Sequence, residues 1–343
     1  MKLYEFDYSL PGELIAQDPL EARDGSRLMV LDRETGETEA ALFRDLPRYL
    51  DCEDHLVVND SKVIPARLHG RKSTGAAIEI LLLRKGQGPG EWEALLKPGK
   101  RVKEGTMIHF GPENPGEARI AGKKSAKVWV LEFTTADDFD TFLRLNGSAP
   151  LPPYIKREGA GKTVSDLERY QTVYAHVPGS VAAPTAGLHF TDRLLSELEM
   201  KGVGITKITL HVGYGTFLPI ESEDIEGHMM EEEFFEITSE SAEKINAAKR
   251  VIAVGTTSTR VLESASDDSG HLKAASGSTR LFIYPGYRFK RVQGLITNFH
   301  LPKSSLFLLA SAFAGKENLI KAYERAIRER FRFYSYGDCM LIL

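Results

Sequence analysis

Hydrophobic residues recur at helical intervals in the last third of the chain. Between Glu317 and Arg330 the apolar positions lie three or four residues apart, which is typical of a helix with one buried face. Similar segments alternate with short apolar runs of the kind that form buried strands. Helices are predicted at Thr191–Lys201, Ser239–Arg250, Thr256–Ser264 and Ser304–Ala314, and strands at Ile205–Val212, Val251–Val254 and Leu281–Tyr284. This alternation indicates a mixed α/β domain.

The first 64 residues have the same mixed character. A short helix is predicted after Pro11, followed by a strand at Leu28–Asp32 and a buried strand at Leu56–Ile64 that ends in polar groups.

Between Ala66 and Phe133 the pattern changes to short apolar runs separated by Gly/Pro turns. Regularly spaced short strands of this kind predict a small antiparallel β-barrel. The runs are Ile78–Leu83, Glu91–Leu96, Thr106–Phe110 and Val128–Phe133. A helix capped by Thr135 and a proline-rich connector at Ala149–Tyr154 follow. The predicted fold class is therefore α/β: a large mixed α/β domain, residues 1–64 plus 151–343, with an inserted small antiparallel β-barrel domain, residues 65–150.

The composition is that of a soluble globular protein, with 42% hydrophobic and 27% charged residues. The longest apolar run, Leu306–Ala314, is too short to cross a bilayer, and the N-terminus is acidic where a secretory signal would be apolar. Two cysteines, Cys52 and Cys339, are too few for a disulfide framework or a four-thiolate zinc site. We therefore expect a cytoplasmic protein with no metal and no membrane contact, and a monomer because no obligate-oligomer feature is present.

Charge is distributed unevenly along the chain. The net charge of −4 argues against a nucleic-acid partner for the molecule as a whole. Between Pro65 and Pro150, however, 14 lysines and arginines face 10 acidic residues. The predicted barrel is thus the part suited to an RNA backbone, although a charge run can also be only a solvated face.

A strand meets a helix through glycine and hydroxyl residues at Val251–Arg260. Free backbone N–H groups at such a helix start, together with Thr256, Thr257 and Arg260, would form an anion site. A turn with ordinary Thr/Ser capping is about equally compatible with this pattern. The segment lacks the Gly-Lys-Ser/Thr ending of a Walker loop, and Gly213–Phe217 lacks the third glycine of a dinucleotide fingerprint.

Three histidines lie in segments rich in small and hydroxyl residues, where a backbone can approach a ligand closely. These are His189, His211 and His300, and each could exchange a proton near neutral pH. Their spacing fits no metal motif. Each taken alone is more simply a structural histidine, whereas the shared surroundings favour one common site.

Ordered motifs along nearly the whole chain resemble the S-adenosylmethionine:tRNA ribosyltransferase-isomerases of queuosine biosynthesis. They include Ser26–Leu28, Val58–Asp60, Val63–Arg67, Lys97–Arg101, Pro150–Ile155, Glu168–Tyr174, Pro184–Phe190, Leu210–Gly213, Gly255–Ser258, Thr297–Pro302 and Ser335–Asp338.

The resemblance implies a two-domain fold and a specific reaction. The ribosyl part of the co-substrate S-adenosylmethionine passes to 7-aminomethyl-7-deazaguanine at the wobble position of a partner tRNA. Isomerisation gives epoxyqueuosine, and adenine and methionine are released. Abstraction of a proton next to the sulfonium needs a base, and departure of adenine is easier with an acid.

Roles for individual residues follow from the motifs as hypotheses. The catalytic candidates are His189 and His211, followed by His300 and Asp338. Candidates for binding S-adenosylmethionine are Thr185, Gly187, Gly213, Thr216, Gly255, Thr256, Thr257 and Arg260, with the methionine carboxylate at the helix start. Candidates for binding tRNA are Arg67, Lys97, Lys100, Arg101, Tyr170 and Asn298.

The chain departs from the family pattern at several positions. Ser61-Lys62 stands where the family usually has threonine and arginine, and Glu231 replaces the second histidine of a His-x-Met-His motif. Tyr214 and Leu218 also differ. Two alternatives stay open: a non-catalytic tRNA-binding protein on the same scaffold, and an S-adenosylmethionine-dependent methyltransferase, which lacks support because no glycine-rich loop follows an early strand.

Overall fold

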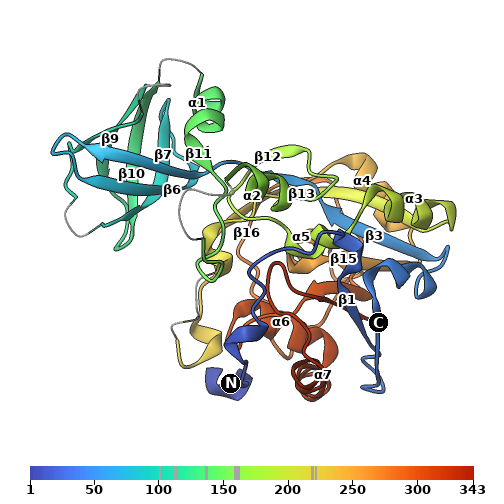
Figure 1. Ribbon diagram of the computed structural model, residues 1–343. Helices are drawn as coiled ribbons and strands as arrows, with labels where there is room; N and C mark the ends of the chain where they lie inside the picture. Colours follow the sequence, from blue (N-terminus) through green and yellow to red (C-terminus); the bar gives the residue numbers. More distant parts are fainter. Residues whose placement is uncertain (100–101, 112–114, 136–137, 158–162, 218–219, 221) are drawn as a thin grey trace.

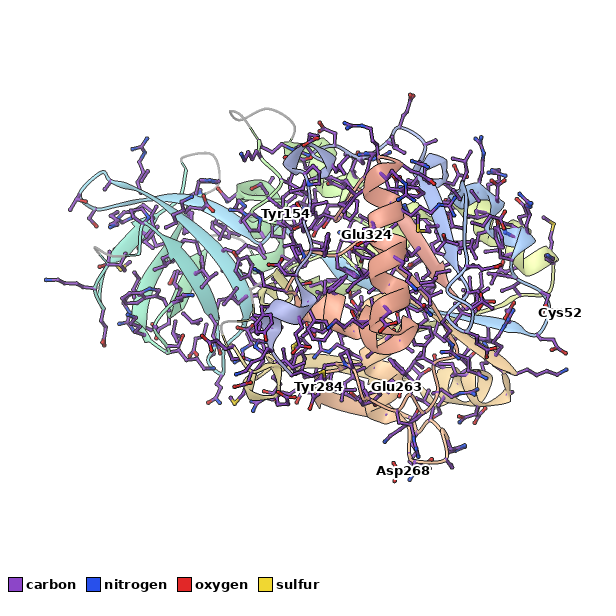
Figure 2. All side chains as sticks on the ribbon, turned by 90° about the horizontal axis from the view of Figure 1, so that it is seen from below. Cys52, Tyr154, Glu263, Asp268, Tyr284 and Glu324 are labelled. Atoms are coloured by element: carbon purple, nitrogen blue, oxygen red, sulfur yellow. The ribbon has the colours of Figure 1, made fainter. Side chains whose placement is uncertain are left out.

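A computed structural model of the chain has two parts, a large α/β domain and a smaller β-barrel beside it (Figure 1). It describes residues 1–99, 102–111, 115–135, 138–157, 163–217, 220 and 222–343. Figure 2 shows both parts from below, with Cys52 at the end far from the barrel and Tyr154 near the junction.

The large domain is built on a mixed sheet of nine strands. Their spatial order is β16 (Ala275–Thr279), β14 (Glu233–Ile237), β13 (Gly204–Leu210), β3 (Asp54–Asn59), β15 (Arg250–Val254), β17 (Gly294–Asn298), β18 (Cys339–Ile342), β1 (Arg27–Leu31) and β2 (Thr38–Leu42). Strands β13, β3, β15 and β17 are parallel, so their carboxyl ends lie at one edge of the sheet.

Apolar side chains on both faces of this sheet are buried. In β3 the side chain of Val57 packs with residues of α5 (Gly255–Ala265), α6 (Ser305–Ala314) and α7 (Lys316–Arg328). Leu56 and Val58 point the other way, into a cluster with α3 (Asp192–Met200). A period of two places successive side chains on opposite faces, which explains the continuous apolar run.

The barrel closes through a pairing between its first strand and β8. Its order is β5 (Arg67–Lys72), β6 (Ala77–Lys85), β7 (Glu91–Lys97), β10 (Val128–Thr135), β9 (Gly116–Lys123) and β8 (Met107–His109), and β8 pairs with β5 again. Strand β11 (Gly147–Ser148) pairs with the start of β5. The mixed α/β domain with an antiparallel barrel agrees with the fold class expected from sequence. All barrel strands lie inside the predicted insert, residues 65–150.

The remaining elements that the structure describes are one short pair of strands, three helices and several 3-10 turns. Strand β4 (Ser61–Val63) pairs with β12 (Val177–Ser180), and the helices are α1 (Phe139–Asn146), α2 (Thr163–Arg169) and α4 (Ser239–Ala247). Short 3-10 helices occur at Leu3–Phe6, Gly12–Leu14, Arg23–Gly25, Phe43–Arg48, Thr185–His189, Tyr214–Phe217 and Ile225–Gly227.

Several element predictions were wrong in their details. The segment 56–64 is two strands, because Asn59 Oδ1 accepts the N–H of Ser61 (3.1 Å) and turns the chain at Asp60. Asp138 caps α1, whereas Thr135, the predicted cap, is the last residue of β10. Residues 281–284 form no strand, and β16 lies instead within the polar segment 264–279. After Pro11 there is only one 3-10 turn.

Candidate functional site

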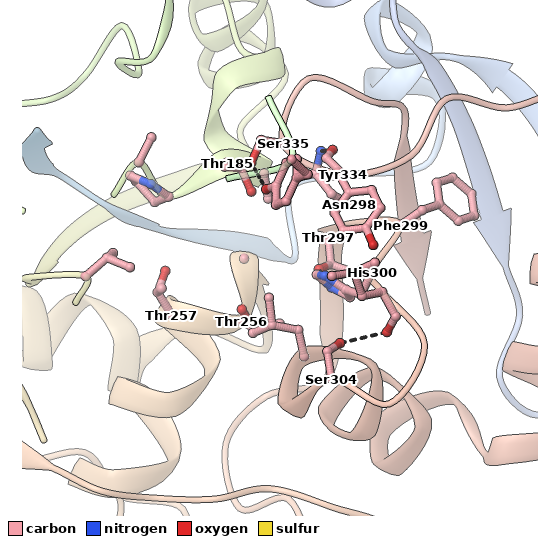
Figure 3. Close-up of a pocket in the computed structure, with 18 of the residues that line it drawn as sticks. Thr185, Thr256, Thr257, Thr297, Asn298, Phe299, His300, Ser304, Tyr334 and Ser335 are labelled. Atoms are coloured by element: carbon pink, nitrogen blue, oxygen red, sulfur yellow. Dashed lines mark hydrogen bonds between the residues drawn. The ribbon is translucent and has the colours of Figure 1, made fainter. Parts of the chain in front are cut away.

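A cavity of about 420 Å³ lies at the carboxyl edge of the parallel strands of the large domain (Figure 3). In open α/β sheets this edge is where ligands bind. Most of the wall comes from four separate segments, which follow β12, β15, β17 and α7 in the chain, and single residues of other segments, among them Leu3 and Tyr154, complete it. Polar residues of the wall include Thr185, Thr256, Thr257, Thr297, Asn298, His300, Ser304, Tyr334 and Ser335.

The start of helix α5 opens on this cavity without a side-chain cap. The N-cap residue is Val254, which makes no capping hydrogen bond, whereas α3 and α6 are capped by Thr191 and Ser304. Ser258 and Thr259 donate to the carbonyls of residues 254 and 255 instead. Ordinary Thr/Ser capping is therefore excluded as the explanation of these hydroxyls. The first N–H groups of α5 have no acceptor inside the helix and can bind an anion.

Three polar atoms of the cavity residues are buried without a hydrogen-bond partner. They are Thr257 Oγ1, Asn298 Oδ1 and the hydroxyl of Tyr334. A buried unpaired polar group costs about 1–3 kcal/mol, so such groups are rare unless something else satisfies them. Three of them around one cavity indicate a ligand that carries its own donors and acceptors.

Unusual backbone conformations occur in the same wall. Lys303 and Tyr334 have φ of 56° and 73°, and both line the cavity. Side chains other than glycine rarely adopt positive φ, and such strain is often held at functional sites. The backbone of the wall is therefore held in conformations that cost local energy and that the surrounding structure must compensate.

His300 is the one predicted catalytic histidine that lines the cavity in the part of the chain described. Its Nε2 lies 2.7 Å from Thr297 Oγ1, and its backbone N–H donates to the Tyr323 hydroxyl (2.9 Å). The Tyr8 hydroxyl donates to the carbonyl of His300. Burial lowers the pKa of His300 to about 3, so the ring is neutral near pH 7.

His189 lies behind the cavity wall. Its Nδ1 is 2.7 Å from Ser26 Oγ and its Nε2 is 3.1 Å from Asn298 Nδ2, so both ring nitrogens are engaged. Burial lowers its pKa to about 3, and the charges of Arg332 and Arg23 add to this effect. In this arrangement His189 orients Asn298, whose Nδ2 also donates to the Tyr334 carbonyl (3.1 Å).

His211 follows β13 and is half-buried outside the cavity lining. Its ring stacks on Phe234 with 6.0 Å between centroids, and Nδ1 is buried without a partner. Burial lowers its pKa, while the carboxylates of Asp60 and Glu236 oppose the shift. The structure therefore does not bring the three histidines together on one wall.

Asp338 is buried and bound to the backbone. Its carboxylate accepts the N–H groups of Arg27 (2.9 Å) and Arg332 (2.7 Å), which joins the start of β1 to the segment before β18. Burial raises its pKa. This geometry is that of a structural link and places Asp338 away from the cavity lining.

The predicted S-adenosylmethionine ligands divide into two groups. Thr185, Gly255, Thr256 and Thr257 line the cavity, whereas Gly187, Gly213 and Arg260 do not. Thr216 belongs to a short 3-10 helix, and its side chain is outside the described residues.

Arg260 is engaged elsewhere. Its guanidinium is 5% exposed and pairs with Glu233, while its Nε donates to the Leu281 carbonyl (2.9 Å). Glu233 also accepts the N–H of Gly213 (2.9 Å). The charge expected to hold a carboxylate is therefore already used inside the fold, and at α5 only the helix start itself faces the cavity.

A second hollow, of about 890 Å³, lies between the barrel and the connector that follows it. We call it the barrel cleft. Its basic residues are Arg67, Lys97, Lys123, Lys127 and Arg157, and its aromatic residues are Trp129 and Tyr214.

The predicted tRNA ligands are scattered. Arg67 pairs with Glu79 and donates to the Leu151 carbonyl (3.0 Å), whereas Lys97 is exposed in the barrel cleft. Tyr170 is fully buried against Tyr336, and Asn298 lies in the cavity. Lys100 and Arg101 lie outside the described residues.

Sequence reasoning missed the aromatic part of the wall. Tyr154 and Tyr334 both line the cavity, with ring centroids 4.5 Å apart, and the Tyr154 hydroxyl is 2.5 Å from Ser335 Oγ. Tyr154 ends the proline-rich connector, so the barrel's return segment reaches the cavity. Tyr334 belongs to an aromatic run, and its neighbour Phe333 is buried in the hydrophobic core. No local sequence signal distinguishes the aromatic residue that lines the cavity from the one that does not.

Within the described residues there is no group of three or more His, Cys, Asp or Glu side chains that could hold a metal ion. None of the helices described is long and apolar enough to cross a membrane.

Known proteins resemble this chain over its full length. The family model described as "Queuosine biosynthesis protein" matches residues 3–342. The S-adenosylmethionine:tRNA ribosyltransferase-isomerase of Syntrophus aciditrophicus is 56% identical, and that of Desulforamulus reducens is 52% identical; each match covers 100% of both chains. The crystal structure of the S-adenosylmethionine tRNA ribosyltransferase of Thermotoga maritima has 38% identity and a TM-score of 0.55, covering 99% of this chain and 100% of that one. The chain therefore belongs to the queuosine biosynthesis protein family.

Proposed function

We propose that this chain is an S-adenosylmethionine:tRNA ribosyltransferase-isomerase. It transfers the ribosyl part of S-adenosylmethionine to the aminomethyl group of 7-aminomethyl-7-deazaguanine at the tRNA wobble position. The product is epoxyqueuosine, and adenine and methionine leave. The observation that carries this proposal is the cavity with three unpaired polar atoms beside an uncapped helix start, in a chain that matches such enzymes end to end.

S-adenosylmethionine fits the cavity by size and chemistry. Small-molecule sites occupy roughly 300–1,000 Å³, and this one has mainly apolar walls with a few convergent polar groups. The methionine carboxylate would bind the free N–H groups at the start of α5, where the helix dipole is positive. Thr257 Oγ1 and Asn298 Oδ1 would then gain the partners that they lack in the free protein.

His300 is the best-placed group for proton transfer. Thr297 engages its Nε2, and Nδ1 has no hydrogen bond to any residue that the structure describes. A neutral ring with one unpaired nitrogen can accept the proton next to the sulfonium. His189 would act through Asn298, holding its amide toward the substrate. His211 would keep a role only if the bound tRNA brings a reacting atom to its buried Nδ1.

The tRNA would contact the barrel cleft. Lys97, Lys123 and Lys127 lie on one side of it together with Trp129, and cationic and aromatic groups of this kind bind an RNA backbone and its bases. The connector on the other side of the cleft carries Tyr154, which lines the cavity, so a base held in the cavity and a backbone held in the cleft can belong to one RNA. We expect the enzyme to act as a cytoplasmic monomer.

The proposal is tested by product analysis. The purified protein is incubated with S-adenosylmethionine and tRNA bearing 7-aminomethyl-7-deazaguanine, the small molecules are separated, and the tRNA is digested. Free adenine and methionine together with epoxyqueuosine are expected. S-adenosylhomocysteine with a methylated tRNA would instead mean a methyltransferase. Binding of tRNA without release of adenine would mean a non-catalytic binding protein.

A further inference from the structure

Two arginines line a small cleft on the far side of the His189–Asn298 contact, and a third lies near it. Arg23 and Arg169 line this cleft together with His189 and Tyr336, and Arg332 lies close enough for its charge to lower the pKa of His189. All three side chains are half-buried. We call Arg23, Arg169 and Arg332 the arginine cluster.

The cluster is held by carbonyl groups rather than by carboxylates. Arg23 donates to the carbonyls of Leu188 (3.2 Å) and Glu168 (3.2 Å), and Arg169 to those of Glu21 (3.2 Å) and Leu20. Arg332 donates to the carbonyl of Asp18. A carbonyl satisfies a donor but neutralises no charge. Three positive charges therefore stand together in a partly buried place.

Neighbouring carboxylates are engaged with other groups. Asp166 and Asp18 pair with Arg157 (2.9 and 3.6 Å), Asp24 pairs with Arg193 (2.8 Å), and Asp338 accepts backbone N–H groups. For the described residues, none of the three guanidinium groups of the cluster has an ion-pair partner within 4.0 Å.

Some hydrogen-bond donors around the cleft are also unpaired. Arg169 Nε, Arg332 Nη1 and the hydroxyl of Tyr336 are buried without a hydrogen-bond partner. Tyr336 is 4% exposed and lines the cleft, and its hydroxyl is near the charge of Asp166 as well as those of Arg157, Arg169 and Arg23. Burying like charges and unpaired donors together is costly unless an anion joins them. Arginine is the residue that binds planar and tetrahedral oxyanions through several hydrogen bonds at once.

We propose that the arginine cluster binds a phosphodiester of the RNA substrate, with Arg169, Arg332 and Tyr336 as its donors. This inference rests on the proposed function.

The position of the cluster suits that role. Ser335 lines both this cleft and the cavity, and His189 in the cleft touches Asn298 in the cavity, so one layer of side chains separates the two. A nucleotide whose base enters the cavity has its own phosphates only a short distance away. The cluster thereby adds a phosphate contact on the large domain to the contacts of the barrel cleft.

The test measures RNA affinity against salt concentration for single-charge variants. The RNA is an anticodon stem-loop carrying 7-aminomethyl-7-deazaguanine, and the variants are Arg169→Gln, Arg332→Gln and the charge-conserving Arg169→Lys. Arg193→Gln is the matched control, since Arg193 is exposed and already paired with Asp24 and Glu197. Each glutamine variant is expected to lower the slope of log affinity against log salt by about 0.7, the value for one lost contact to a single strand. The lysine variant and the control keep the slope.

A second experiment, with chemically modified RNA, identifies the phosphate that the arginine cluster binds. Replacing one backbone phosphate at a time by an uncharged methylphosphonate is expected to reveal one position that weakens binding to the unmodified chain but not to Arg169→Gln. Thermal midpoints show that each variant is folded, and Arg332→Gln serves if Arg169→Gln unfolds.

Three results would overturn the inference. An unchanged salt slope in folded glutamine variants removes the site, while adenine release by the unmodified chain would leave the proposed function intact. A fall in S-adenosylmethionine affinity in place of RNA affinity would assign the cluster to a carboxylate. Absence of RNA binding by the unmodified chain would refute the site and the proposed function together.

Discussion

The cavity and the barrel cleft differ in how they treat charge. In the cavity most polar groups are neutral hydroxyls, amides and a histidine whose pKa burial lowers to about 3, and the lysine of its wall, Lys303, pairs with Asp7 (2.7 Å). In the barrel cleft the basic groups are exposed or paired, as Lys97 and Arg67 show. The cavity is built mainly from four distant segments, whereas one side of the cleft is a local antiparallel sheet.

This difference separates two tasks. The cavity suits the chemical reaction, and the barrel cleft suits the binding of tRNA. A buried wall makes each hydrogen bond strong and holds reacting atoms in place. An exposed basic surface is screened by salt and contributes mainly to the rate and strength of encounter with a polyanion. Changes in the cavity should therefore have large and specific effects, and changes in the cleft small effects that depend on salt.

The largest effect is expected for His300→Ala. Removing a group that transfers a proton typically lowers the turnover rate by about 100- to 10,000-fold. Adenine release under saturating substrates measures this, and calorimetry should show S-adenosylmethionine bound nearly as tightly as before. His271→Ala is the control, because His271 is exposed in a loop. A variant with near-normal turnover would take proton transfer away from His300.

The next largest effect is expected from breaking a buried arginine–glutamate pair, compared with breaking an exposed one. Arg260 and Glu233 are 5% and 4% exposed, whereas Arg280 and Glu232 are 65% and 39% exposed. Breaking the buried pair with Arg260→Met leaves an uncompensated charge and should lower the free energy of unfolding by roughly 3–5 kcal/mol. Arg280→Met should lower it by less than about 1 kcal/mol. Denaturant titration measures the free energy of unfolding of both variants. Equal losses would contradict the expected difference between the buried and the exposed ion pair.

Acid should destabilise the large domain through its buried histidines. The folded pKa of His189 is about 3, below the ordinary value of 6.5, so the unfolded chain binds the proton more readily. Stability is therefore complete above pH 6.5 and falls as the pH drops toward 3. One such histidine contributes about 1.4 kcal/mol per pH unit within that window. His189→Gln should remove this contribution, measured as a shallower loss of unfolding free energy; an unchanged slope would mean His189 is already solvated.

A smaller effect is expected at Thr257. Its buried Oγ1 lacks a partner in the free protein, so Thr257→Val should not weaken folding. Loss of one hydrogen bond to bound S-adenosylmethionine should raise the dissociation constant by a factor corresponding to about 1 kcal/mol, roughly fivefold. Thr259→Val is the matched control in the same helix, because Thr259 Oγ1 already donates to the Gly255 carbonyl. Equal affinities for both variants would place the ligand elsewhere.

The smallest effect concerns the barrel cleft. Replacing Lys97 and Lys123 together by glutamine should weaken tRNA binding modestly at low salt and reduce the salt slope by about 1.4, with S-adenosylmethionine binding unchanged. The control pair, Lys85 and Lys103, is also on the barrel but does not line the cleft. If both pairs behave alike, the lysines of the cleft are only a solvated face.

Local patterns were sufficient wherever a signal is local. The helix Glu317–Arg330 appears as α7, and the helices predicted from Thr191 and Ser304 begin at these residues, which cap them. The barrel was recognised from regular turns, although β9 at Gly116–Lys123 was not predicted. The strand expected at Leu281–Tyr284 failed because its apolar side chains pack on the large core without a neighbouring strand to pair with.

For the candidate site, local sequence patterns predicted which residues take part but not how each one is bonded. Thr185, Gly255, Thr256, Thr257, Asn298 and His300 were all named from sequence and line one cavity. The same reasoning named Arg260 and Asp338, whose charges the fold uses for Glu233 and for backbone N–H groups. Residue types reveal which groups are suited to chemistry, but not which partners occupy them.

By itself the sequence determined the family, the two-part architecture and the set of polar residues from which a site is built. These depend on the order of residue types and on apolar periodicity, which are properties of short segments. Only the tertiary structure decided that His300 faces the cavity while His189 stands behind Asn298, and that three arginines gather without an ion-pair partner among the described residues. Burial and pairing arise between segments more than a hundred residues apart, so no local pattern contains them.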